Sequence, residues 1–170
     1  QLQEMATKAR RLPTFMNAFL RLHLNVWTNQ VQRWIMPDLW DENGGAPIKE
    51  QDLRGRPCYG GLDLSSVSDI TAWIKLFEDG EDPDLVRILC KFWCPEEKLT
   101  DDTNPYHEQY QSWHRMGYLE TTPGNAIDYQ FVKAQIIEDA KLFELREVAV
   151  DRLFQGYQLS MELADEGLTV

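Results

Sequence analysis

Residues 57–64 read PCYGGLDL, a short apolar run with Asp63 near its end. Apolar and aromatic residues bounded by turn residues are typical of a β-strand. The runs ITAWIKLF at 70–77 and LVRILCKFW at 85–93 have the same character. The polar SSVSD at 65–69 is typical of a turn. We therefore predict three sequential strands, of which the first two form a hairpin.

The second half of the chain alternates between helical and strand patterns. Asp128 precedes 129–143, where apolar residues recur at helical spacing. EVAV at 147–150 indicates a short strand ending at Asp151, and 155–166 indicates another helix. Residues 168–170 have the pattern of a further strand. This order predicts an α/β fold whose mixed sheet, antiparallel on one side and parallel on the other, is flanked by helices.

The first 42 residues or so are rich in helix formers and aromatics, which predicts a helical arm. A helix is expected to start near Pro13 and run towards Trp27, and residues 1–10 to end an earlier helix. The turn residues at 43–47 mark a boundary. The tryptophans of the arm are predicted to be core residues rather than base-stacking residues: Trp27, Trp34 and Trp40.

The composition limits the function classes. The net charge of −11 argues against tight, independent DNA binding, because a surface that holds a phosphate backbone is normally basic. Carboxylates can still serve a nuclease, since they hold divalent cations that neutralise the phosphate. There is no GxxxxGK[ST] loop, no membrane-length apolar run and no leader, so we expect an intracellular protein that is not itself a phosphate-loop ATPase.

Neither the cysteines nor the histidines predict a metal site. The three cysteines have no paired spacing, and we interpret Cys58, Cys90 and Cys94 as core thiols. The three histidines lack metal-ligand spacing, and a packing role is favoured for His23.

Two aspartates carry the chemical hypothesis. Asp63 lies in an apolar strand, where a carboxylate is costly unless it is hydrogen-bonded, protonated or coordinating a cation, and Asp151 ends another strand. If the strands are neighbours, the two acids converge at one edge and could hold hard divalent cations. On spacing alone, a turn role for Asp63 and a helix cap at Asp151 are favoured over a metal site.

Several longer motifs add to this. FLRLHLNVWTNQVQRWI at 19–35, LRGRPCYGGLDLSSVSDITAW at 53–73, FWCPEE at 92–97, GYLETTPGNAIDYQFV at 117–132 and VAVDRLFQGYQL at 148–159 together resemble the large terminase subunits of tailed bacteriophages. In that family an ATPase motor precedes an RNase H-like nuclease that cuts concatemeric DNA. The resemblance implies a helical junction from a missing ATPase domain at 1–52, with ATP used only there, and a partial RNase H-like nuclease domain at 53–170.

The resemblance also implies site residues and partners. Asp63 and Asp151 match two catalytic aspartates that bind two Mg²⁺ or Mn²⁺ ions, while a third acid lies on a later helix, beyond Val170. The chain is thus expected to be an excerpt, incomplete at its C-terminus and weak or inactive alone. Asp69 also matches an acid of the motif, although a turn role is favoured for it. The implied partners are double-stranded DNA, a portal protein and a small terminase subunit, in the host cell cytoplasm and without a membrane.

Two alternatives remain open from the sequence. A non-catalytic docking module of the packaging motor would use the acidic surface to bind a basic partner. An actin-like sugar kinase would also carry an aspartate in its first strand, but 64–68 lacks the glycine of a phosphate-binding turn.

Overall fold

The computed structural model describes residues 2–26, 35–67, 69–82, 84–151 and 155–170. The described helices and strands, in chain order, are α1 (Leu2–Arg11), α2 (Pro13–Leu24), α3 (Pro37–Glu42), the 3-10 helix η1 (Glu50–Leu53), β1 (Pro57–Asp63), β2 (Thr71–Glu78), β3 (Val86–Pro95), the 3-10 helix η2 (Glu96–Leu99), α4 (His107–Arg115), β4 (Glu120–Thr122), α5 (Tyr129–Leu142), β5 (Glu144–Val150) and α6 (Gln155–Asp165).

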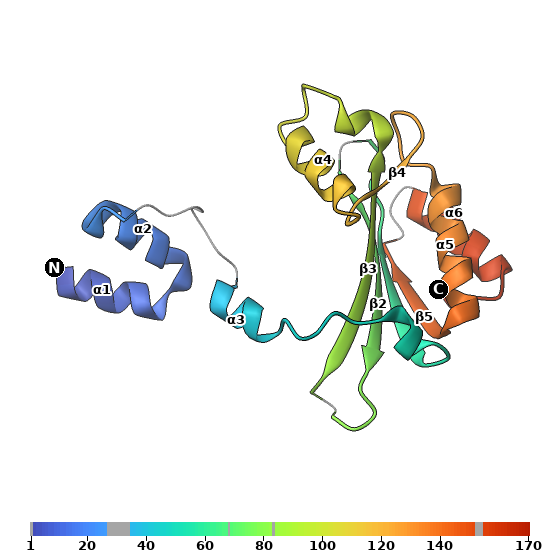
Figure 1. Cartoon of the computed structure of the whole chain (residues 1–170), viewed down its shortest axis with the longest axis horizontal. Helices are drawn as coiled ribbons and strands as arrows, with labels where there is room; N and C mark the ends of the chain where they lie inside the picture. The colour runs from blue at the N-terminus through green and yellow to red at the C-terminus, as the bar shows by residue number, and fades with distance from the viewer. Residues whose placement is uncertain (1, 27–34, 68, 83, 152–154) are drawn as a thin grey trace. The chain divides into compact units, whose positions relative to one another are not determined.

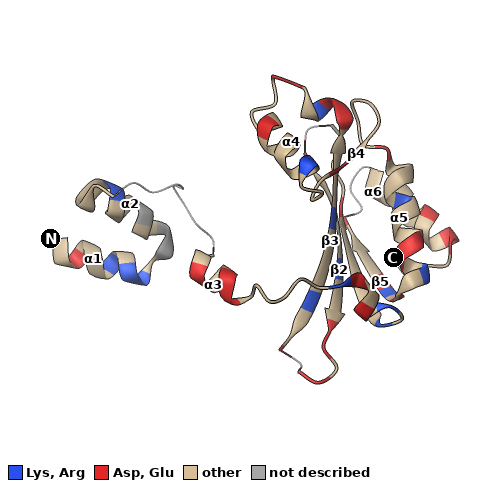
Figure 2. Cartoon of the chain, in the orientation of Figure 1, with Lys and Arg blue, Asp and Glu red and all other residues tan. Residues whose placement is uncertain are grey.

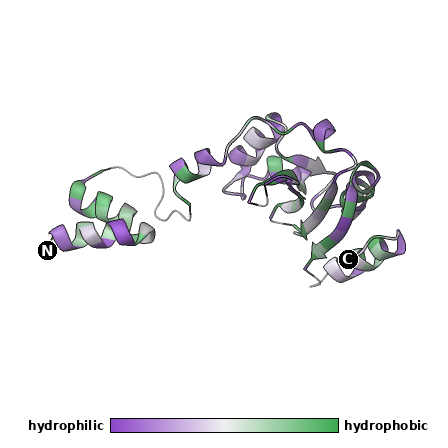
Figure 3. Ribbon diagram, turned by 90° about the horizontal axis from the view of Figure 1, so that it is seen from below, coloured by the Kyte–Doolittle hydropathy of each residue, from purple (hydrophilic) through white to green (hydrophobic). Residues whose placement is uncertain are grey.

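The chain divides into two compact units, Gln1–Pro47 and Ile48–Val170. In the first, Pro13 occupies the first turn of α2, as predicted, and Asn25 ends the helix in the left-handed conformation. Figure 3 shows α2 as largely hydrophobic and α1 as mixed. Among the described residues, no helix is long and apolar enough to cross a membrane. The role of residues 1–52 as a junction stays a prediction.

The second unit is built on a five-stranded sheet with the order β4-β3-β2-β1-β5. β1 pairs antiparallel with β2, and β2 with β3, which confirms the predicted hairpin and third strand. β5 returns through α5 to lie parallel to β1 on its other side, and β4 is parallel to β3. The mixed sheet predicted from the sequence is therefore confirmed (Figure 1).

The two faces of the sheet differ sharply. Leu62, Trp73 and Val148 point to the face covered by α5 and α6, where they form the main core with Ile136 and Leu159. The opposite face, which we call the open face, is partly covered by α4 through Phe92 and Cys94. Elsewhere it leaves apolar side chains in solvent: Tyr59 is 44% and Ile88 is 46% exposed.

A buried ion pair joins β2 to α5 on the covered face. The Lys75 ammonium lies 2.7 Å from Asp139 Oδ2, and both side chains are 2% exposed. Trp73 Nε1 donates to the same oxygen at 2.7 Å, and Gln135 Nε2 donates to Asp139 Oδ1 at 3.1 Å. The buried carboxylate thus has the several donors that a charge needs away from water. The buried indole ring also requires glycine at position 60 of β1, because a Cβ there would lie 2.2 Å from the ring.

Several sequence predictions are wrong in detail. Residues 168–170 are not a strand, although Val148 N–H donates to the Thr169 carbonyl at 2.8 Å, so the segment lies along β5 without forming a ladder. Cys90 is exposed because its part of the open face is uncovered, whereas Cys58 and Cys94 are buried as predicted. Trp40 is 68% exposed in the short helix α3 and is not a core residue. Trp27 and Trp34 lie outside the described residues.

Candidate functional site

Asp63 and Asp151 lie at the same end of two neighbouring parallel strands. Leu62 of β1 is in register with Val150 of β5, and the two aspartates are the next residues of these parallel strands. Neighbouring strands lie about 4.8 Å apart. Because Leu62 packs into the main core, alternation assigns Asp63 to the opposite side, the open face. Asp151 directly follows Val150, the last residue of β5. Two carboxylates therefore stand at the same edge of the sheet.

Exposure changes one part of the argument for Asp63. The sequence predicts that this residue lies in an apolar strand, where a carboxylate would be costly, but it is the last residue of β1 and its side chain is exposed. The cost of burying a carboxylate therefore gives no reason to expect a bound cation at Asp63. The argument from its position beside Asp151 does not depend on that cost.

The loop that follows Asp63 is fixed by both the sheet and α5. Ser65 N–H donates to Thr71 Oγ1 at 3.0 Å, at the start of β2. The Tyr129 hydroxyl donates to the Ser65 carbonyl at 2.7 Å, and Ile127 N–H donates to the Ser66 carbonyl at 2.9 Å. Burial raises the pKa of the Tyr129 phenol, which keeps the hydroxyl proton available for this bond. The backbone after Asp63 is thereby held from two sides.

The segment that supplies these donors is itself rigidly built. Buried Thr122 accepts a hydrogen bond from Asp128 N–H at 3.1 Å, and the Asp128 carboxylate caps α5 by accepting from Gln130 N–H at 2.9 Å. The helix start predicted at Asp128 is confirmed. Sequence reasoning identified the cap but missed its consequence, which is that Ile127 and Tyr129 hold the loop beside Asp63.

Gly156 explains how Asp151 is placed. This buried glycine lies in the first turn of α6, and a Cβ there would lie 1.9 Å from the Asp151 carbonyl oxygen. The start of α6 therefore lies directly against the backbone of Asp151, which leaves room for glycine alone. The motif VAVDRLFQGYQL contains both Asp151 and Gly156, but the sequence alone does not show that the two residues are in contact.

Asp69 is engaged in its own turn. Its carboxylate accepts a hydrogen bond from Ile70 N–H at 2.8 Å, and its carbonyl accepts one from the Ser65 hydroxyl at 2.7 Å. Both contacts fit the turn role favoured from the sequence. Across the described part of the chain, no group of three or more His, Cys, Asp or Glu side chains could together hold a metal ion.

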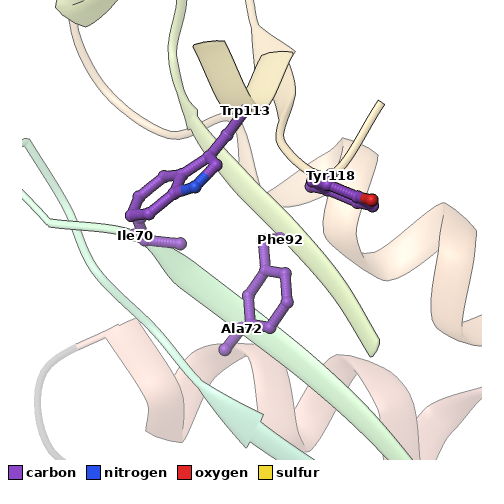
Figure 4. A pocket seen from close by; sticks show the side chains of 5 residues that line it. All are labelled: Ile70, Ala72, Phe92, Trp113 and Tyr118. Atoms are coloured by element: carbon purple, nitrogen blue, oxygen red, sulfur yellow. The ribbon is translucent and has the colours of Figure 1, made fainter. Parts of the chain in front are cut away.

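An apolar pocket of about 430 Å³ opens beside this edge of the sheet. It is lined by Ile70, Ala72, Phe92, Trp113 and Tyr118 (Figure 4). We call it the aromatic pocket. Sequence reasoning missed it, because its walls come from segments far apart in the chain: β2 and the residue before it, β3, and α4 with the turn after it.

The family described as terminase large subunit, endonuclease domain, matches residues 1–158. The chain belongs to this family. It is 36% identical over 151 residues to the terminase large subunit of Enterobacteria phage HK97, covering 89% of this chain and 29% of that protein.

Two further similarities agree with the family. The crystal structure of the HK97 bacteriophage large terminase matches with a TM-score of 0.65 at 35% identity, over 98% of this chain and 33% of that one. Protein YmfN of Escherichia coli K12 is 24% identical over 168 residues, covering 95% of this chain and 36% of that protein. The terminase nuclease chain thus has the RNase H-like fold predicted for it and spans about a third of these relatives.

The two carboxylates at this edge of the sheet suit a hard divalent cation. Carboxylate oxygens are the ligands that Mg²⁺ and Mn²⁺ prefer, and Asp63 and Asp151 offer them from adjacent strands. Figure 2 shows acidic and basic positions interspersed along residues 48–170. A cation bound by the carboxylates at this edge would neutralise the charge of a phosphate there. The ligand roles of Asp63, Asp69 and Asp151 stay predictions.

Proposed function

We propose that this terminase nuclease domain cuts concatemeric double-stranded DNA by metal-dependent hydrolysis of a phosphodiester, with Asp63 and Asp151 as metal ligands. The single observation that supports this most directly is the register of Leu62 with Val150, since Asp63 and Asp151 are the residues that directly follow this pair. Family membership adds the expectation of a nuclease. A third carboxylate, expected from the family on a later helix, would complete the set.

The chain's own contribution is to hold two carboxylates in place before any substrate arrives. The Tyr129 and Ile127 hydrogen bonds fix the backbone after Asp63, and the Gly156 contact fixes the backbone of Asp151. When bound there, two Mg²⁺ or Mn²⁺ ions would activate a water and stabilise the leaving oxygen of the phosphodiester. Fixed ligands of this kind lower the reorganisation needed during the reaction.

The test uses the intact large subunit with plasmid DNA and Mn²⁺. We expect nicking or linearisation that disappears in Asp63→Asn and in Asp151→Asn. The matched control is Asp165→Asn, an exposed aspartate of α6, which should cut like the unmodified protein. Asp69→Asn reports whether that residue contributes a ligand or only a turn. Cutting that persists in Asp63→Asn would overturn the assignment.

A docking role for the same domain is the second candidate, and the net charge of −11 favours it. The portal protein and the small terminase subunit are the partners we propose by family resemblance. Docking alone predicts that Asp63→Asn leaves DNA cutting unchanged, whereas the leading proposal predicts its loss. The two roles are therefore separated by the same variant.

A further inference from the structure

The aromatic pocket lies in line with Asp63 across the open face. Asp63 is in register with Ala72, and Ala72 is in register with Phe92, so the three form one row over β1, β2 and β3. Paired residues of an antiparallel sheet point to the same side. Two strand spacings, about 10 Å, therefore separate Asp63 from the pocket wall at Phe92.

The outer walls of the pocket are held in place by the turn after α4. Tyr118 N–H donates to the Trp113 carbonyl at 2.9 Å, and Gly117 adopts the positive φ of 78° that this turn requires. Trp113 stacks on buried Tyr110 with ring centroids 5.9 Å apart. The Tyr118 side chain is nevertheless 65% exposed. The pocket is thus preformed and open to solvent.

The lining of the aromatic pocket suits the base of a nucleotide better than its phosphate. None of the five lining residues is charged, and Asp63 stands in the same row, so the pocket itself attracts no phosphate. An aromatic-lined site of this size, within the range of about 300–1,000 Å³ for small-molecule sites, suits a flat apolar face. The face of a nucleobase has this chemistry, and every base has one.

We propose that the aromatic pocket holds one unstacked base of the DNA strand, close to the phosphate at Asp63. The inference rests on the proposed function, which puts the scissile phosphate at Asp63. A separation of about 10 Å places this base within a few nucleotides of the scissile phosphate. Since bases inside an intact duplex are stacked, the pocket selects strands that are locally unpaired or distorted.

The experiment measures binding separately from cutting. The intact subunit is titrated, in Ca²⁺ to prevent hydrolysis, into fluorescein-labelled (dT)12 and into a blunt 12-base-pair duplex, and anisotropy is recorded. Tyr118→Ala should weaken (dT)12 binding by about 5- to 150-fold, the range for losing one base–aromatic stack. Duplex binding should change less than about two-fold, since its bases are already stacked. Tyr118→Phe, which keeps the ring, should bind as the unmodified protein does.

Controls separate the possible outcomes. Tyr157→Ala removes a similarly exposed tyrosine, 59% exposed on α6, and should leave binding unchanged. An all-abasic oligonucleotide should bind equally to the Tyr118→Ala and unmodified proteins. If Tyr118→Ala leaves (dT)12 binding unchanged, or weakens the abasic oligonucleotide as much, the base pocket is refuted, and a protein docking surface becomes the better explanation. Failure of the proposed function would appear instead as metal-dependent cutting that survives Asp63→Asn.

Discussion

Replacing Asp139 with leucine should destabilise the domain by roughly 3–5 kcal/mol, because the Lys75 ammonium would remain buried without its counter-charge. Lys75 is 2% exposed, and its Nζ lies 2.7 Å from Asp139 Oδ2. The same substitution removes the acceptor of the Trp73 indole N–H. The perturbed contacts join β2 to α5, so we expect the whole sheet–helix layer to weaken.

The expected loss is large compared with the total stability of a domain, which is about 5–15 kcal/mol. For a chain of this length each kcal/mol lowers Tm by about 2–4 °C, so the drop should be roughly 6–20 °C. Thermal and urea unfolding at pH 7, followed by circular dichroism, measure it. Glu138→Leu is the matched control on the same helix, and because Glu138 is exposed it should change stability by no more than about 0.5 kcal/mol.

A second variant tests the cause. Adding Lys75→Met to Asp139→Leu removes the stranded charge, so the double variant should regain at least about 2 kcal/mol. A remaining loss of about 1–3 kcal/mol is expected from the unpaired Trp73 N–H. The reasoning is refuted if Asp139→Leu costs less than about 1 kcal/mol, or if the double variant is no more stable than the single one.

Three further predictions follow from contacts elsewhere in the domain. Gly60→Ala should lower the free energy of unfolding in urea by about 1–3 kcal/mol, because its Cβ would lie 2.2 Å from the Trp73 ring. Gly61→Ala, whose Cβ would have no atom within 4 Å, should not lower it, and equal effects of the two variants would contradict the prediction. The Arg87 hydrogen bond lowers the pKa of Asp79 to about 2. The stabilising contribution of the ionised Asp79 carboxylate is therefore present above pH 3.8 and is lost as the pH falls through about 2. Arg87→Gln should return the pKa of Asp79 towards 3.8 in an NMR titration and leave the pKa of Asp101 unchanged. Burial raises the pKa values of Cys58 and Cys94 to about 11, and desolvation also raises the pKa of Cys90, but Cys90 is the exposed thiol of the three. At pH 8 a thiol reagent should therefore modify Cys90 first, and Cys90→Ser should abolish the fast phase.

β1, β2 and β3 could be predicted because each is a contiguous apolar run bounded by turn residues, and the bounds of β1 and β2 differ from the prediction by one residue at each mismatched end. The short polar strand β4 has no such run and was not predicted. The Lys75–Asp139 pair could not be predicted. Its partners are 64 residues apart, and a lysine within an apolar strand is ordinarily read as an exposed residue. Only the packing of α5 over β2 brings the two charges together. The aromatic pocket is a similar case, since three separate segments supply its walls.

For the two aspartates of the candidate site, the sequence argument was incomplete. A carboxylate in an apolar strand suggested burial at Asp63, yet the residue is exposed. What brings Asp63 and Asp151 together is topology: β5 returns through α5 to run parallel to β1, and parallel neighbours end at the same edge of a sheet. A ladder shifted by one residue would turn one of the two side chains towards the core, because successive residues of a strand face opposite sides. The close contact of Gly156 with the Asp151 backbone, together with the two hydrogen bonds on the loop after Asp63, therefore bears on the proposed metal site, since these contacts hold the backbone next to the two carboxylates.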